Sequence, residues 1–197
     1  MSDLKLFLLG SPRAVLDGSP IEINRQKSMA LLVYLSLHES EQHRDTLAAI
    51  FWPESSQSRA RASLRRDLST LNKALGENWL IIERDTIALE RTHLWIDVLQ
   101  FRTLLAKCHQ HDHGPDEVCV DCLQPLSAAV DLYQDDFMTG FTLPDCPEFD
   151  EWQFFLTEAL RQEYFSALER LVRGFIAAED YDLALVNARR LLAIDPL

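Results

Sequence analysis

The 197-residue sequence contains few glycines and no glycine-rich loop, which argues against an enzyme that cradles nucleotide phosphates. Its 6 glycines are scattered along the chain. A serine nucleophile elbow and an HExxH metalloprotease motif are also missing. Paired acids such as Asp135 and Asp136 lie where carboxylates commonly stabilise helix starts and loops. We therefore expect a protein that is not an enzyme.

Long apolar runs and a secretion signal are absent as well. No stretch approaches the roughly 20 apolar residues needed to span a bilayer. The short apolar run near the N-terminus has neither a basic flank nor a small-residue cleavage site. With only four cysteines and no sign of secretion, a disulfide framework is not expected. These features predict a cytoplasmic, nucleoid-associated protein with no membrane partner.

Positive charge is scarce overall but concentrated locally. The net charge is −12, yet residues 1–97 carry 12 basic and 13 acidic side chains, whereas residues 98–197 carry 7 and 18. Within 59–73 there are five basic side chains and one acid. Because nucleic-acid affinity depends on local positive charge near phosphates, an acidic second half does not exclude DNA binding by the first.

The pattern of apolar residues and turn signals predicts two domains. Residues 1–96 read as short strands joined by an Asp17-Gly18 turn, then three helices, then a hairpin at 80–96. This order is typical of a winged helix-turn-helix, in which the hairpin forms the wing. Residues 97–197 read as all-helical. The predicted helices cover 26–38, the segment between His43 and Pro53, 56–75, 98–110, 123–134, 148–178 and 181–193.

The last two predicted helices resemble one tetratricopeptide helix pair, in which small Ala184 and Ala188 allow close approach and Pro196 ends the unit. Such repeats need stacked neighbours. We therefore expect the TPR-like helical domain to continue beyond residue 197. The predicted fold class is mostly α with a small β component, a winged helix-turn-helix followed by an all-α domain.

The helix at 56–75 is the expected recognition helix. Leu64, Leu68 and Leu71 form an aliphatic stripe, while the outer side carries arginines and hydroxyls that suit phosphates and base edges. Asp67 is expected near the base-reading surface, where it would accept from a cytosine amino group. Arg84 is expected at the tip of the wing. The predicted DNA-binding residues are Arg59, Arg65, Arg66, Ser69, Thr70, Lys73, Arg84, Lys27 and Arg44.

Four segments of the first domain, LKLFLLGSPRAVLDGSPIEI, RQKSMALLVYLSLH, RDTLAAIFWPE and ARASLRRDLSTLNKALG, resemble the OmpR-like winged helix of antibiotic regulatory protein (SARP-like) activators. In the second half, AVDLYQDDFMTGF and PEFDEWQFFLTEALRQEYFSALERL resemble the bacterial transcriptional activator domain. The resemblance implies a transcriptional activator that binds direct-repeat promoter sites on double-stranded DNA as two side-by-side protomers. It also implies recruitment of RNA polymerase.

A cluster of cysteine and histidine occupies residues 108–122. Cys108 and His111 form one CxxH pair, and Cys119 and Cys122 form one CxxC pair, which is a spacing that suits tetrahedral zinc. His109 or His113 are alternatives to His111. We expect a structural zinc site that fixes a polar loop, with no open coordination position for catalysis. A reduced, metal-free loop is the alternative.

Two other functions are consistent with these patterns. A helical-repeat adaptor would use the same winged helix to bind protein, and would show no salt-dependent DNA binding. A metal-responsive regulator would couple the cysteine and histidine cluster to DNA affinity.

Overall fold

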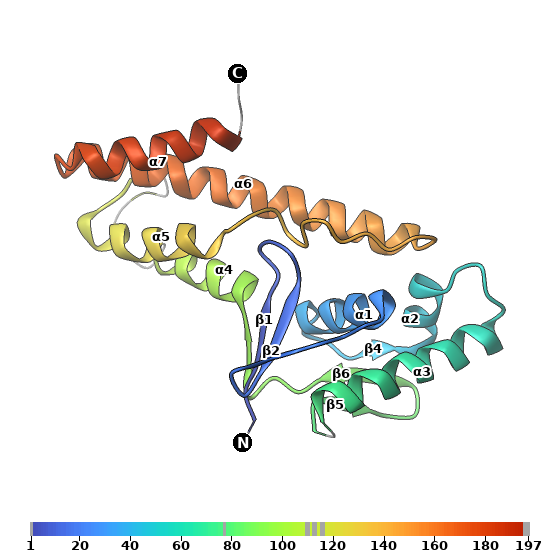
Figure 1. Ribbon diagram of the computed structural model, residues 1–197. Coiled ribbons are helices and arrows are strands. Elements are labelled where there is room, and N and C mark those ends of the chain that lie inside the picture. Colours follow the sequence, from blue (N-terminus) through green and yellow to red (C-terminus); the bar gives the residue numbers. More distant parts are fainter. Residues whose placement is uncertain (1, 77, 109–110, 112–113, 115–116, 195–197) are drawn as a thin grey trace. The chain divides into compact units, whose positions relative to one another are not determined.

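The computed structural model describes residues 2–76, 78–108, 111, 114 and 117–194. The chain divides into two compact units (Figure 1). The first comprises residues 1–6, 13–96 and 140–154, and the second comprises residues 7–12, 97–139 and 155–197. The functional boundary expected between residues 96 and 97 stays a prediction.

The first unit begins with a four-stranded sheet. Its strands are β1 (Leu4–Phe7), β2 (Arg13–Leu16), β3 (Ser19–Ile21) and β7 (Leu94–Ile96), in the order β3-β2-β1-β7. Asp17 and Gly18, both with positive φ, make the tight turn between β2 and β3, because an asparagine- or aspartate-glycine pair tolerates this backbone. Strands β2 and β3 pair antiparallel across this turn, whereas β7 pairs with β1 in parallel.

Three helices follow, at nearly the predicted positions. They are α1 (Gln26–Leu37), α2 (Arg44–Phe51) and α3 (Gln57–Leu75). Gly76 ends α3 with φ 91°, and its N–H donates to the Asn72 carbonyl. Residues Ala30 to Leu35 of α1 are all buried, so this helix forms the centre of the unit. Ser56 occupies the N-cap position of α3, although its side chain makes no capping hydrogen bond.

A second, three-stranded sheet forms the wing. The antiparallel strands β5 (Leu80–Ile82) and β6 (Thr86–Leu89) make the predicted hairpin. The short strand β4 (Gln42–His43), which carries no sequence signal of its own, pairs with the other edge of β6. Because β4 leads directly into α2, this pairing fixes the hairpin next to the start of that helix. The Arg44 N–H donates to the Asp85 carbonyl at 3.0 Å and adds to the same link.

Residues 140–154 complete the first unit through aromatic packing. Phe149 is fully buried, with its ring 5.5 Å from that of Phe51, and Trp152 lies 5.1 Å from Tyr34. The Cys146 thiol is also buried and donates to the Phe51 carbonyl. Through these contacts, residues 140–154 extend the hydrophobic core of the winged helix, although they are distant from it in the sequence.

The second unit is helical. Its helices are α4 (Asp97–Lys107), α5 (Val120–Leu132), most of α6 (Pro147–Ala177) and α7 (Tyr181–Ile194). The buried Asp97 carboxylate accepts the N–H groups of Leu8 and Leu9 at 2.7 and 2.9 Å, which ties residues 7–12 to the start of α4. None of the helices within the described residues combines the length and the hydropathy needed to cross a membrane.

Candidate nucleic-acid interface

Helix α3 has a buried side and a basic exposed side. Ala60, Leu64, Leu68, Leu71 and Leu75 are at most 3% exposed, as the aliphatic stripe predicts. On the outside, a row of residues spaced by four runs along most of the helix. This exposed row consists of Arg61, Arg65, Ser69 and Lys73.

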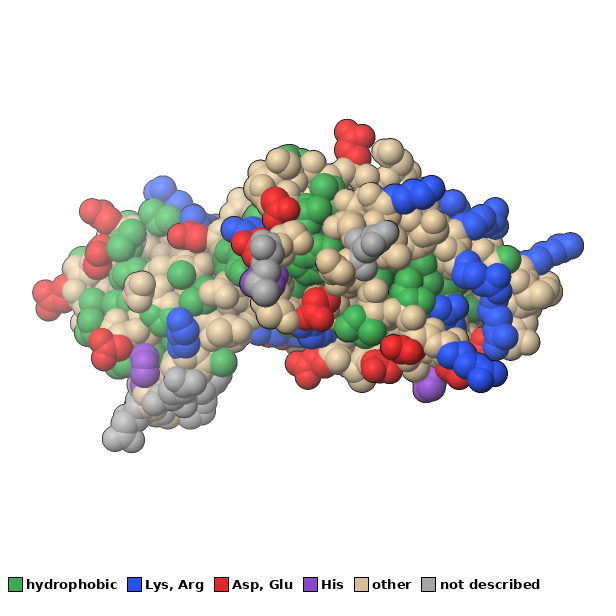
Figure 2. Space-filling view, turned by 90° about the horizontal axis from the view of Figure 1, so that it is seen from below, with side chains coloured by type: hydrophobic (Ala, Val, Ile, Leu, Met, Phe, Trp, Pro, Cys, Tyr) green, Lys and Arg blue, Asp and Glu red, His purple; other side chains and the backbone are tan. Residues whose placement is uncertain are grey.

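Two adjoining pockets lie between this row, the start of α2 and the wing. The larger, of 710 Å³, is lined by His43, Arg44, Asp45, Thr46, Arg61, Leu64, Arg65, Arg84 and Asp85. The smaller, of 400 Å³, is lined by Arg44, Arg65, Leu68, Ser69, Asn72, Lys73 and Ile82. Arg44 and Arg65 line both, so the two pockets form one basic groove along α3. Figure 2 shows Lys and Arg side chains gathered on the first unit where α2 and α3 lie.

The structure brings five of the nine predicted DNA-binding residues to this groove, namely Arg44, Arg65, Ser69, Lys73 and Arg84. Arg84 occupies the turn between β5 and β6, at the tip of the wing, and is exposed. Arg61 also lines the groove and was not among the predicted residues. Its spacing of four from Arg65 was the signal that would have identified it.

A second row on α3 holds Arg59, Arg66 and Thr70, beside the groove. Arg66 is exposed and donates to the Ser63 hydroxyl at 2.9 Å. The Thr70 hydroxyl donates to the Arg66 carbonyl at 3.0 Å, so its proton is already used within the helix. The roles of these three residues in base contact stay predictions.

Lys27 lies apart from both rows. Its ammonium donates to the Phe51 carbonyl at 2.5 Å and stands 5.4 Å from the centre of the Trp52 ring. The side chain is half-buried, and its charge is used to join α1 to the end of α2. A contact between Lys27 and phosphate stays a prediction that these internal contacts do not favour.

The expectation that Asp67 lies near the base-reading surface is wrong. Asp67 is fully buried, where its carboxylate accepts from the Ser28 hydroxyl at 2.6 Å and pairs with Arg25 at 3.2 Å. The physical reason is helical spacing, because Asp67 follows Leu64 by three residues and precedes Leu71 by four. It therefore belongs to the inward side of α3.

Two acids line the groove, Asp45 and Asp85. Asp45, in the first turn of α2, accepts two hydrogen bonds from the Arg61 guanidinium at 2.6 and 2.7 Å. The hydrogen bond from Arg61 holds the pKa of the Asp45 carboxyl below its usual value. The carboxylate thus stays charged and partly neutralises Arg61 at the groove.

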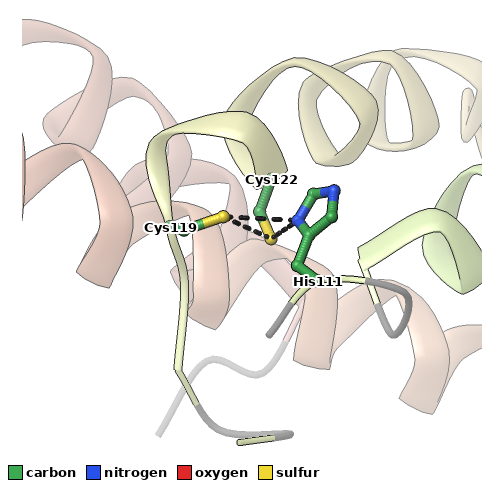
Figure 3. A group of neighbouring side chains, drawn as sticks. All are labelled: His111, Cys119 and Cys122. Atoms are coloured by element: carbon green, nitrogen blue, oxygen red, sulfur yellow. Dashed lines mark hydrogen bonds between the residues drawn. The ribbon is translucent and has the colours of Figure 1, made fainter. Parts of the chain in front are cut away.

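The predicted metal ligands lie in the second unit, and three of them converge. His111 in the loop after α4 and Cys119 and Cys122 at the start of α5 point toward one another (Figure 3). The His111 Nδ1 is 3.0 Å from the Cys122 sulfur and 3.3 Å from the Cys119 sulfur, and the two sulfurs are 3.6 Å apart. Burial raises the pKa of the Cys122 thiol to about 11.

The fourth predicted ligand, Cys108, is buried beside this group. Its sulfur lies 3.8 Å from the Cys122 carbonyl oxygen. It is outside the set of ligand atoms that all lie within 4.8 Å of one another. The alternative ligands His109 and His113 fall outside the described residues.

Comparison with solved structures identifies a relative in fold. Mycobacterium tuberculosis EmbR, solved in complex with a low affinity phosphopeptide, aligns with a TM-score of 0.65 and 21% sequence identity. The alignment covers 99% of this chain, which spans 61% of the length of that EmbR chain. This likeness confirms the predicted fold class. No protein-family model and no curated protein matches the sequence.

Proposed function

We propose that this chain is a sequence-specific DNA-binding transcriptional regulator. The observation that carries the proposal is the basic groove between α3 and the wing, on a chain with the fold of EmbR. Five basic side chains line this groove, and only two acids accompany them. A fixed cluster of cations of this kind gains affinity for a duplex by releasing counterions from its phosphates.

The dimensions of α3 suit the major groove. Its 19 residues make a helix about 28 Å long at 1.5 Å per residue. A B-DNA major groove about 12 Å wide admits one helix. With the leucine stripe facing inward, the arginines of both outer rows extend from the side that would enter the groove. Arg65 and Arg66 are our first choices for guanine contacts, because an Arg fork binds the guanine O6 and N7 atoms bidentately.

The wing and the start of α2 would contact the flanking backbone. Arg44 is the first residue of α2, so its guanidinium would add to the attraction of the helix N-terminus for phosphate. Arg84 at the tip of the hairpin would reach the neighbouring minor groove. The pairing of β4 with β6 holds these two basic residues close together at one pocket.

More specifically, we infer that the regulator is a transcriptional activator of the antibiotic regulatory protein type. Two protomers would bind side by side on direct-repeat promoter sites, and the acidic helical unit would contact RNA polymerase. These points are supported by the segment resemblance across both halves of the sequence and by the excess of acidic residues after position 97.

Selection of bound sequences from a random duplex pool by the whole chain tests the proposal. We expect one recurrent motif, bound more tightly than shuffled DNA. Arg65→Glu should abolish the enrichment, because it places a negative charge in both pockets. The matched control Arg189→Glu, an exposed change on α7, should retain it. A pool without any enriched motif contradicts the proposal and favours the adaptor.

A further inference from the structure

The cluster of His111, Cys119 and Cys122 has the dimensions of a tetrahedral metal site. Zinc binds sulfur at about 2.3 Å and imidazole nitrogen at about 2.0–2.1 Å, so two ligand atoms on it stand about 3.6–3.8 Å apart. The three observed separations are 3.0, 3.3 and 3.6 Å. An ion at the centre would therefore move the ligand atoms apart by about 0.2 to 0.6 Å.

We propose that Cys108, His111, Cys119 and Cys122 bind a structural zinc ion in the helical unit. Cys108 lies beside Cys122, with its sulfur 3.8 Å from the Cys122 carbonyl oxygen, and its side chain would move toward the group to become the fourth ligand. Thiolate and imidazole are the ligands that favour zinc over harder cations. With four protein ligands the site has no open position, so its role is structural.

The position of the cluster explains what the ion would stabilise. The CxxC turn lies on α6 at Gly174, where an added Cβ would be 2.7 Å from the Leu123 side chain and 2.8 Å from that of Val118. The start of α5 therefore packs closely against α6. Zinc would link the end of α4 to this closely packed CxxC turn.

The sequence between Cys108 and Val118 is polar. Between positions 109 and 117 the sequence reads HQHDHGPDE, which offers no aliphatic side chain to a core. A structural metal supplies folding free energy where hydrophobic burial cannot. The zinc site would thus hold together the α4–α5 connection independently of DNA.

A redox role for the CxxC pair is the competing explanation, since Cys119 occupies the N-cap of α5. A redox pair needs only the two cysteines. Here His111 Nδ1 also lies 3.0 Å from the Cys122 sulfur and 3.3 Å from the Cys119 sulfur, as a third metal ligand would.

Titration of the reduced, metal-free whole chain with Co²⁺ tests the site. We expect one equivalent to give the strong visible absorption of tetrahedral cobalt with a sulfur charge-transfer band, and Zn²⁺ to displace it. Cys119→Ser, Cys122→Ser and His111→Ala should each lose the stoichiometric absorption. Cys108→Ser should weaken the sulfur band, and an unchanged band would remove Cys108 from the site.

Cys146→Ser is the matched control, because it removes a buried thiol from the first unit, and it should bind Co²⁺ like the parent chain. Circular dichroism checks that each variant is folded. In the unmodified zinc-loaded chain, a chelator should lower the thermal midpoint. Absence of stoichiometric Co²⁺ binding, or ready formation of a Cys119–Cys122 disulfide in a chain that binds no metal, overturns the proposal. No DNA is present, so this failure leaves the proposed function untouched.

Discussion

The hydroxyl of Ser28 in α1 donates a 2.6 Å hydrogen bond to the carboxylate of Asp67 in α3, and both residues are fully buried. The Arg25 guanidinium pairs with the same carboxylate oxygen at 3.2 Å. This polar link fixes the rotation of α3 about its own axis. Because Asp67 faces inward, the arginine rows face outward.

Replacement of Ser28 by alanine should destabilise the first unit. The variant leaves a buried carboxylate with one hydrogen bond fewer, which costs about 1–3 kcal/mol. Urea denaturation measures the free energy of unfolding. Ser58→Ala, an exposed change on α3, is the control and should stay within about 0.5 kcal/mol of the parent chain. Equal stability of Ser28→Ala and the parent would show that the link contributes nothing.

Arg66→Ala should weaken specific DNA binding by more than about 1 kcal/mol, or several-fold in Kd, if this side chain reads a base. The fold should persist, because Arg66 is exposed and lies off the leucine stripe. Fluorescence anisotropy with the selected motif and with shuffled DNA gives the two affinities. A loss on both DNAs alike would assign Arg66 to phosphate, and no loss on either would exclude it from the interface.

Asp45→Asn should tighten DNA binding. The substitution removes a negative charge from the groove and frees Arg61, which Asp45 now holds with two hydrogen bonds. One additional phosphate contact would steepen the salt dependence of log K by about 0.9. Asp182→Asn, an exposed change on α7, removes the same charge far along the chain and serves as control. Weaker binding of Asp45→Asn would mean that the pair is needed to position Arg61 in the complex.

Much of the first unit could be predicted from sequence because strong local signals mark it. Asp17-Gly18 marks a turn, and Pro53 and Gly76 mark the ends of α2 and α3. The leucine spacing identifies the buried side of α3. The short strand β4 carries no such signal, since two residues show no periodicity. The parallel pairing of β1 with β7 and the packing of residues 140–154 in the first unit depend on long-range contacts.

The basic groove and the metal cluster were each predictable in part. The count of charged residues indicates the basic helix, and the sequence spacing indicates the CxxC and CxxH pairs. The charge of Asp67 suggests an exposed position, but its spacing from Leu64 and Leu71 places it on the buried side of α3. The involvement of Lys27 with the Phe51 carbonyl follows from tertiary structure alone.

The ion pair of Asp136 with Arg161 should make the stability of the helical unit depend on pH. The hydrogen bond from Arg161 lowers the pKa of Asp136 in the native state. Its stabilisation is therefore present above the unfolded-state pKa of about 3.9 and is lost as pH falls through the lower native value. Both side chains are more than a third exposed, so water screens the pair. We therefore expect the pair to contribute only about 1 kcal/mol to the free energy of unfolding.

Asp136→Asn tests this dependence. The difference in unfolding free energy between this variant and the parent should be largest near neutral pH and should shrink as the pH falls below about 4. In chains that also carry Arg161→Ala, the effect of Asp136→Asn on the unfolding free energy should no longer shrink as the pH falls below about 4. A difference that is constant across the range in the parent background would contradict the assigned cause.

The salt dependence of DNA affinity tests the central claim most directly. Equilibrium binding of the whole chain to its selected duplex is measured over a series of salt concentrations, for the parent and for Arg44→Ala and Lys73→Ala. We expect log K to fall linearly with log salt, and each variant to show a slope shallower by about 0.9, because each loses one phosphate contact. Binding that does not change with salt, or slopes that the two substitutions leave unaltered, would contradict a DNA interface along α3.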